Sequence, residues 1–477
     1  MPDAVCLDRS LPVAIIGGGP VGLAAAAHLI ERGLRPCVFE AGSEPGTAVR
    51  EWRHVRMFTP WLFNLDAAAC RLLEAKGWKA PDTDAFPTGA DIIALYLAPL
   101  ATALDEAGAN LRYNAKVIGV SRRHHDRLRE GERAAGRGRD AAPFVLHVAV
   151  AGGAIQVVEA SAVIDCSGTW TSPNPAGAHG LPAPGETANA DRIAYGIPDV
   201  LGISRSTYAG ATTLVLGGGH SAMNAVLDLV TLARQAPGTR IMWAFRRPLA
   251  DINFGGGAAD GLAARGTLGA QANALIESQQ VQALAPFLVH RIEREGDRLL
   301  VHGDRGGNAD TVLTDRMIVA TGFRPDLSWL GEMRLTLDPA VQATPSLAPL
   351  IDPNLHSCGT VRPHGEAELR HPDEPGFYVA GMKAYGRAPT FLLATGYEQV
   401  RSIAAHLAGD IAAARRVELV LPETGVCSTQ RPVSVSVTTE RNCGPISARE
   451  PACKPTVTAA CCGPIPYEGS TRSPRYP

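Results

Sequence analysis

Two glycine-rich turns, each set between an apolar run and a helix-forming run, constrain this chain more than any other feature. The first reads Gly17-Gly-Gly19-Pro20-Val-Gly22 and follows the apolar residues 11–16. The second reads Gly217-Gly-Gly219-His220-Ser221-Ala222 and follows residues 212–216. In the dinucleotide-binding fingerprint, the first glycine permits a tight turn, the second admits a pyrophosphate, and the third allows close helix packing. Two such turns in one chain predict two bound dinucleotides.

The first turn predicts a site for FAD or NAD. The helix expected over residues 21–31 places free N–H groups and the positive end of its dipole at the pyrophosphate. Glu40 closes the next strand, eighteen residues beyond Gly22. A carboxylate at that place accepts hydrogen bonds from the ribose hydroxyls and repels a 2′-phosphate, so NADP is excluded.

The second turn predicts a site for NADPH. Ala222 stands in place of the third glycine, which the fingerprint allows. The strand expected over residues 240–245 ends in Arg246 and Arg247. Guanidinium groups at this place can hold a 2′-phosphate in bidentate fashion. The alternative is that both arginines are solvated side chains at a strand end.

Three later strand-then-glycine units connect the two sites. They end at Gly168, at Thr321-Gly322 and at Gly381, and the last precedes a helix expected over residues 391–407 that contains Thr395. The first two units are expected where the chain crosses between domains, and the last helix should point its N-terminus at the flavin. The predicted fold class is α/β, with an FAD-binding Rossmann-type domain (1–205 and 323–420) and an inserted NADPH-binding domain (206–322). A cysteine-rich, disordered tail is expected over 421–477.

Composition limits the classes of partner. The 477 residues carry a net charge of −2, which gives no argument for a nucleic-acid or anionic-membrane partner. The N-terminal residues lack an apolar signal core, and we expect a soluble, cytoplasmic protein. Residues 122–139 mix arginines with acids and glycines, which favours a solvated loop, with a binding patch as the alternative.

Five segments carry a resemblance to a known family. They are 52–61 (Trp52-Arg-His-Val-Arg-Met-Phe-Thr-Pro-Trp61), 166–175, 355–360, 386–396 and 421–427. In these segments the chain resembles flavin monooxygenases of bacterial arsenic-resistance operons, within the two-dinucleotide-domain flavoproteins that include thioredoxin-reductase-like enzymes. The resemblance implies FAD, NADPH, oxygen, a small substrate and a role in handling arsenic compounds. The related reductases end their late flavin motif in Gly-Asp, whereas Gly381 is followed by Met382, so the carboxylate is missing or supplied elsewhere.

The cysteines argue against disulfide exchange near the flavin. Disulfide reductases need a close cysteine pair, and the region after the first turn offers only Cys37 and Cys70. The leading hypothesis is therefore monooxygenation. Trp52 and Arg53 lie in the segment that runs beside the flavin in relatives, and Asn64 is a candidate donor to a flavin peroxide; Arg53 and Asn64 are the proposed catalytic residues.

The tail holds five of the ten cysteines, after residue 426. Soft thiolates suit thiophilic centres such as trivalent arsenic, and Cys461, Cys462 and Cys453 are candidate ligands. A tail without function is the alternative. Two other functions stay open: an NADPH-dependent flavin reductase or oxidase that uses the tail thiols, and a metalloid-binding flavoprotein with little turnover. A homodimer is an open assembly state.

Overall fold

The computed structural model describes residues 7–132, 137–252, 254, 260, 262–355, 364–388 and 391–419. The chain divides into two compact units, 1–431 and 432–477, and the described residues all belong to the first. Within this unit, two separate five-stranded parallel sheets carry the two glycine-rich turns, which confirms the predicted α/β fold class. We call each sheet with its helices a lobe.

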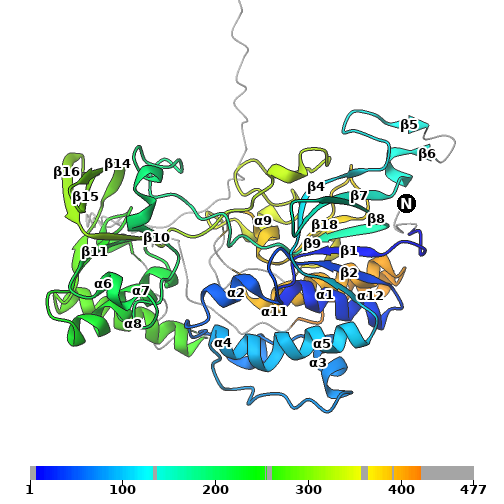
Figure 1. The fold of residues 1–477 in the computed structure, drawn as a ribbon, viewed down its shortest axis with the longest axis horizontal. Coiled ribbons are helices and arrows are strands. Elements are labelled where there is room, and N and C mark those ends of the chain that lie inside the picture. Colours follow the sequence, from blue (N-terminus) through cyan, green and yellow to red (C-terminus); the bar gives the residue numbers. More distant parts are fainter. Residues whose placement is uncertain are drawn as a thin grey trace, which may run out of the picture. The chain divides into compact units, whose positions relative to one another are not determined.

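The first sheet has the strand order β18-β9-β1-β2-β3. Figure 1 labels β18, β9, β1 and β2 of this sheet. Its strands are β1 (Val13–Ile16), β2 (Pro36–Phe39), β3 (Asn110–Arg112), β9 (Ala162–Asp165) and β18 (Phe377–Val379). All four residues of β1 are buried, as expected for an apolar run in a parallel sheet covered on both faces. Ile16 lies opposite Phe39 on one side and Asp165 on the other, so three strand ends meet beside the first turn.

Helix α1 (Pro20–Glu31) begins at the first turn and packs against α11 (Leu393–Leu407). Residues 24–27 of α1 are four alanines, all buried, and such small side chains let two helices approach closely. Gly33 follows α1 with φ +69°, the left-handed conformation that commonly ends a helix. The other helices of this lobe are α2 (Thr47–Glu51), η1 (Trp61–Phe63), α3 (Ala67–Glu74), α4 (Gly89–Ile92), η2 (Ile93–Leu97), α5 (Ala98–Glu106), η8 (Ser328–Leu330), α9 (Ala348–Ile351), α10 (Glu366–Leu369), η9 (Gly381–Tyr385) and α12 (Ile411–Arg415).

The second sheet has the order β10-β17-β11-β12-β13. Its strands are β10 (Ile193–Tyr195), β11 (Thr212–Leu216), β12 (Arg240–Ala244), β13 (Gln282–Leu284) and β17 (Arg316–Val319). Helices α6 (Arg205–Tyr208), α7 (His220–Gln235) and α8 (Ala263–Glu277) and the turns η5 (Thr187–Arg192) and η6 (Leu249–Asp251) complete this lobe. Because β10 belongs to the second sheet, that sheet begins before residue 206.

Small antiparallel sheets accompany both lobes. They are formed by β4 (Ala115–Arg122), β7 (Phe144–Val150) and β8 (Ile155–Ala160), by β14 (Leu288–Glu295), β15 (Arg298–Arg305) and β16 (Asn308–Thr314), and by the short pair β5 (Gly131–Glu132) and β6 (Arg137–Gly138). A short turn, η4 (Arg139–Ala141), precedes β7.

The prediction that residues 122–139 form a solvated loop is wrong at both ends. Arg122 and Arg139 are 4% and 0% exposed. Arg122 Nε and Arg139 Nη1 each lie 2.7 Å from a different carboxylate oxygen of Glu374, which is fully buried. The three side chains form a buried ion triad that ties the ends of this segment to the chain just before β18. Residues 126–131, between these ends, are exposed as expected.

The predicted crossing segments lie side by side. Asn174 N–H donates to Gly322 O (2.9 Å), and the Thr321 hydroxyl donates to Asn174 O (2.9 Å). Trp170 stacks on Phe323 with ring centroids 4.8 Å apart. The chain thus leaves the first sheet after β9 and returns after β17 along one paired connection.

Candidate functional site

The first turn has the shape that a dinucleotide requires. Gly17 has φ +105°, and a Cβ there would meet the Cys166 carbonyl at 2.6 Å. A Cβ at Gly22 would overlap the carbonyl oxygen of Gly17, so α1 can start this close to β1 only with glycine. Gly19 has no atom within 4 Å of an added Cβ, and no side chain caps α1. The helix N-terminus therefore faces open space, where a pyrophosphate can approach its N–H groups. Pro20 fills the first helical position, where its missing N–H costs nothing.

Glu40 directly follows β2 and lies against the first turn. Its Oε2 accepts a hydrogen bond from Gly18 N–H (2.7 Å), and its Oε1 accepts one from Gly42 N–H (2.8 Å). Two backbone donors fix the carboxylate, and each oxygen keeps a lone pair for a further donor. This geometry fits the predicted contact with ribose hydroxyls, which stays a prediction.

Gly381 follows β18, which is the neighbour of β9 in the first sheet. It has φ +74°, and a Cβ there would lie 3.5 Å from the side chain of Val21 in α1. Its N–H donates to Gln399 Oε1 in α11 (2.7 Å). Thr395 is buried in the first turn of α11. Gly168 follows β9 with φ +70°. The glycines predicted to bind the first cofactor therefore lie at the carboxyl ends of adjacent parallel strands, where α/β sheets bind ligands.

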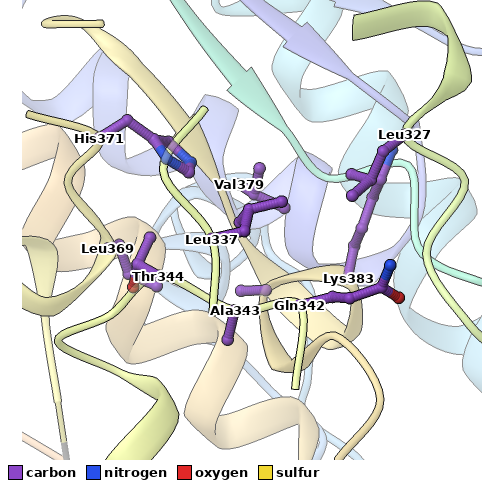
Figure 2. A pocket seen from close by; sticks show the side chains of 10 residues that line it. Leu327, Leu337, Gln342, Ala343, Thr344, Leu369, His371, Val379 and Lys383 are labelled. Atoms are coloured by element: carbon purple, nitrogen blue, oxygen red, sulfur yellow. The ribbon is translucent and has the colours of Figure 1, made fainter. Parts of the chain in front are cut away.

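Lys383 was missed by sequence reasoning. Its Nζ lies 2.7 Å from Asp165 Oδ2 and 3.1 Å from Ser167 Oγ, and 4.4 Å from the centre of the Trp329 ring. Lys383 also lines a cavity of about 10 Å³ that His371 borders (Figure 2). That volume holds at most one water, so this cavity cannot take a substrate. The sequence does contain a signal for this pair, because Asp165 is the last residue of a predicted strand and Lys383 comes two residues after Gly381.

The second turn repeats the geometry of the first. Gly217 has φ +132°, and Gly219 leaves open space at the start of α7, which has no side-chain cap. His220 and Ser221 form the first turn of this helix. Burial and the charge of Arg265 lower the pKa of His220, whose ring lies 5.2 Å from that of Phe58. An imidazole that is neutral at the N-terminus of α7 adds no charge of its own to the site.

Arg246 and Arg247 follow β12 and are exposed. Among the residues that the structure describes, no hydrogen bond or ion pair engages either guanidinium. They are therefore free to hold an anion beside the second turn, and their role in NADPH binding stays a prediction.

In the proposed catalytic segment, Trp52 and Asn64 are packed against other residues, whereas Arg53 is exposed. A Cβ at Gly89 would meet the Trp52 ring at 2.8 Å, so Trp52 packs closely on that residue. Arg53 is exposed. Asn64 is buried; its amide donates to the carbonyls of Thr59 and Pro60 (both 2.9 Å) and accepts from the Thr59 hydroxyl (3.0 Å). These contacts stabilise the loop, and the catalytic roles of Arg53 and Asn64 stay predictions.

The three cysteines in the described ranges are free thiols. Burial raises the pKa of Cys37 to about 11 and that of Cys70 to about 12, and burial with the charge of Asp165 raises that of Cys166 well above its usual value. Cys453, Cys461 and Cys462 lie outside the described residues. No cluster of metal-ligating side chains occurs in the part of the chain with a described structure. Among the described helices, none is both long enough and apolar enough to cross a bilayer.

Comparison with known proteins supports the assignment of the first lobe. The family profile described as FAD dependent oxidoreductase matches residues 12–83, which span the first turn, β2 and the segment through Trp52 and Asn64. This match confirms the FAD prediction for the first turn. No curated protein sequence matches the chain.

Solved flavoprotein structures share the fold over most of the chain. Bacillithiol disulfide reductase Bdr (YpdA) from Bacillus cereus is 19% identical, with a TM-score of 0.61 over 85% of this chain and 99% of its own. Ornithine N-hydroxylase from Kutzneria sp. 744, solved with reduced FAD, NADP⁺ and L-ornithine, is 15% identical, with a TM-score of 0.55 over 85% and 100%. A flavin-containing monooxygenase from Stenotrophomonas maltophilia is 20% identical, with a TM-score of 0.52 over 84% and 98%. At these identities the likeness shows a shared fold.

Proposed function

We propose that this protein is an FAD-dependent monooxygenase that takes electrons from NADPH and acts on a small substrate. The observation that carries the proposal is a pair of matching turns with opposite charge at the following strand end. Glu40 lies against the first turn, where it favours a ribose and repels a 2′-phosphate. Arg246 and Arg247 are exposed after the strand beside the second turn, where they favour a 2′-phosphate.

The described thiols favour oxygen chemistry over disulfide exchange. Exchange needs a thiolate, and the pKa values of Cys37, Cys70 and Cys166 are all raised. Cys166 lies beside the first turn, since a Cβ at Gly17 would meet its carbonyl, yet burial and the charge of Asp165 keep its thiol neutral. The fold is shared with both a disulfide reductase and monooxygenases, and these thiols favour the monooxygenases.

In the proposed reaction, NADPH gives two electrons; one atom of O₂ is inserted into the substrate and the other leaves as water. FAD supplies the electron transfer between NADPH and oxygen. The chain's own residues bind and orient: the α1 N-terminus and Gly19 hold a pyrophosphate, Glu40 accepts from ribose hydroxyls, and α7 with Gly219 holds the second dinucleotide.

A trivalent arsenic compound is the substrate class that we propose. The support is the resemblance of five segments to flavin monooxygenases of arsenic-resistance operons, together with the five cysteines after residue 426. Thiolates are the soft ligands that such a centre prefers.

The test measures NADPH consumption and hydrogen peroxide in air by the FAD-loaded full chain, with arsenite, with methylarsenite and without either. Coupled oxygenation predicts substrate-stimulated NADPH loss without matching peroxide. Peroxide equal to NADPH in every condition would instead indicate an oxidase or a different substrate. A chain lacking residues 428–477 serves as the comparison: loss of flavin reduction on truncation would favour the tail-thiol reductase. Tight arsenite binding with negligible NADPH loss would indicate a metalloid-binding flavoprotein.

A further inference from the structure

Ser167 lies directly against the first glycine-rich turn. A Cβ at Gly17 would lie 2.9 Å from Ser167 Cα, and a Cβ at Gly22 would lie 3.5 Å from Cys166 Cβ. Cys166 N–H donates to the carbonyl of Ile16 (2.8 Å), which fixes this segment beside the end of β1. Ser167 is exposed, although the preceding Cys166 is buried. The turn that binds the first cofactor therefore has an exposed serine beside it.

Three residues form a closed network at this place. Asp165 Oδ1 accepts a hydrogen bond from Ser167 N–H (3.0 Å), and Asp165 Oδ2 lies 2.7 Å from Lys383 Nζ. Lys383 Nζ also donates to Ser167 Oγ (3.1 Å). Asp165 and Lys383 are 0% and 2% exposed, so both charges are buried and Ser167 is the exposed member of the network. The backbone and the side chain of Ser167 are thus both held from the protein interior.

The contact with Lys383 decides which role the Ser167 hydroxyl can play. An ammonium group carries only donors, so Ser167 Oγ must accept from it. The hydroxyl hydrogen is then free for another acceptor, and no residue in the described part of the chain accepts it. A hydroxyl that accepts from a cation is also a stronger donor, because successive hydrogen bonds polarise one another. Ser167 therefore offers a donor that suits an anionic acceptor.

FAD brings such an acceptor to the first turn. Its diphosphate oxygens are anionic, and the N-terminus of α1, which has no side-chain cap, offers N–H groups to the same diphosphate. We propose that the Ser167 hydroxyl donates to a diphosphate oxygen of FAD, and that Lys383 is the positioning residue that directs this hydroxyl. The inference rests on FAD binding at the first turn and does not depend on oxygenation.

The test measures the affinity of the full chain, stripped of its cofactor, for FAD by the quenching of flavin fluorescence. Ser167→Ala removes the donor, and a hydrogen bond to a charged group is stronger than one between neutral groups, so the Kd should rise about tenfold or more. Ser167→Thr keeps a hydroxyl and should bind FAD like wild type. Without FAD, both variants should melt close to wild type, because Ser167 is exposed.

ADP separates the diphosphate from the rest of the cofactor. It contains a diphosphate and lacks the flavin and the ribityl chain, and its displacement of FAD reports on the first site. The inhibition constant of ADP should rise in Ser167→Ala by about the same factor as the Kd of FAD. Loss of FAD affinity without loss of ADP affinity would overturn the proposal, because the hydroxyl would then contact the flavin half.

Ser161→Ala is the matched control. Ser161 directly precedes β9, at the opposite end from Ser167, and its hydroxyl donates to the carbonyl of Pro12 (3.1 Å), so FAD and ADP should bind unchanged. Normal FAD binding by Ser167→Ala, or an equal loss in Ser167→Ala and Ser167→Thr, overturns the proposal. A wild-type chain that binds no FAD would overturn the FAD assignment itself, and this inference with it.

The role of Lys383 is tested in the double variant Asp165→Asn with Lys383→Met, in which neither buried charge remains. In that background Ser167→Ala should raise the Kd for FAD by about threefold or less, because no ammonium group directs the hydroxyl. The same factor in both backgrounds would overturn the positioning role of Lys383.

Discussion

The ammonium nitrogen of Lys383 lies 2.7 Å from Oδ2 of Asp165, with both side chains at most 1% exposed. Asp165 is the last residue of β9, and Lys383 lies in η9, just after the neighbouring strand β18. A carboxylate therefore does reach this end of the sheet, but it comes from β9 and is paired with a lysine. Asp165 lies opposite Ile16, the residue that precedes the first turn.

Removing one partner of this pair should destabilise the fold strongly. Lys383→Met leaves Asp165 buried without a counter-charge, and we expect a loss of about 3–5 kcal/mol in the free energy of unfolding. The double variant Asp165→Asn with Lys383→Met should recover much of that loss, since neither group is then charged. Lys116→Met, at an exposed lysine of β4, should change stability by less than about 0.5 kcal/mol. Urea unfolding measures all three, and an equal loss in the single and double variants would contradict the pairing.

Alanine substitutions at two glycines of the first turn should have different effects, one on protein stability and the other on FAD affinity. Gly22→Ala places a methyl group on the carbonyl of Gly17, so the turn must shift and the free energy of unfolding should fall even without cofactor. Gly19→Ala meets no protein atom and has ordinary backbone angles, so the apoprotein should keep its stability. Its methyl group instead points at the space where the pyrophosphate approaches, and FAD affinity should drop at least tenfold. Thermal melting and FAD titration separate the two effects; normal FAD binding by Gly19→Ala would argue against a pyrophosphate there.

The exposed arginine pair should set the choice between NADPH and NADH. Arg246→Ala with Arg247→Ala removes both guanidinium groups, and we expect the KM for NADPH to rise at least tenfold while that for NADH changes little. Each charge-assisted contact to a phosphate contributes about 1.5–3 kcal/mol, which is consistent with this factor. Arg205→Ala, in the same lobe but bonded to Gln235, is the control and should leave both constants unchanged. Equal loss for both nucleotides would mean that the arginines do not contact the 2′-phosphate.

The sequence predicted the elements that obey local rules. The strand over 212–216 matches β11, and the first helix differs by one residue, because glycine turns and apolar runs act within a few residues. The ion triad of Glu374 with Arg122 and Arg139 was not predicted. Its partners lie more than two hundred residues apart in the sequence, and an arginine-rich segment has the composition of a solvated loop.

In the candidate site, too, the features set by local sequence were predicted and those set by long-range packing were not. Gly17, Gly22 and Gly217 have the close contacts or positive φ that the fingerprint implies. Neither the hydrogen bonds that surround Asn64 nor the pairing of Lys383 can be read from spacing, because both depend on how distant segments pack.

The stability of the second lobe should depend on pH through Asp228 in α7. Burial and the nearby charge of Asp199 raise the pKa of this carboxyl from 3.8 to about 6. The folded protein therefore binds this proton more tightly than the unfolded chain does. Stability is favoured while the group is protonated in both states, falls as pH rises from about 4 to 6, and stays lower above that.

Asp228→Asn removes the free-energy cost of ionising this buried carboxyl. We expect the variant to be more stable than wild type at pH 7.5 by about 1–3 kcal/mol. A pKa shift of one unit corresponds to about 1.4 kcal/mol, and the partial exposure of Asp228 makes the effect smaller than the full shift would give. At pH 4 the two proteins should unfold alike, so the difference should grow between pH 4 and 6. Asp373→Asn, at an exposed acid, should differ from wild type by less than about 0.5 kcal/mol throughout. Urea unfolding from pH 4 to 8 gives these differences. A stabilisation by Asp228→Asn that is the same at pH 4 and pH 7.5 would show that the carboxyl charge is not its cause.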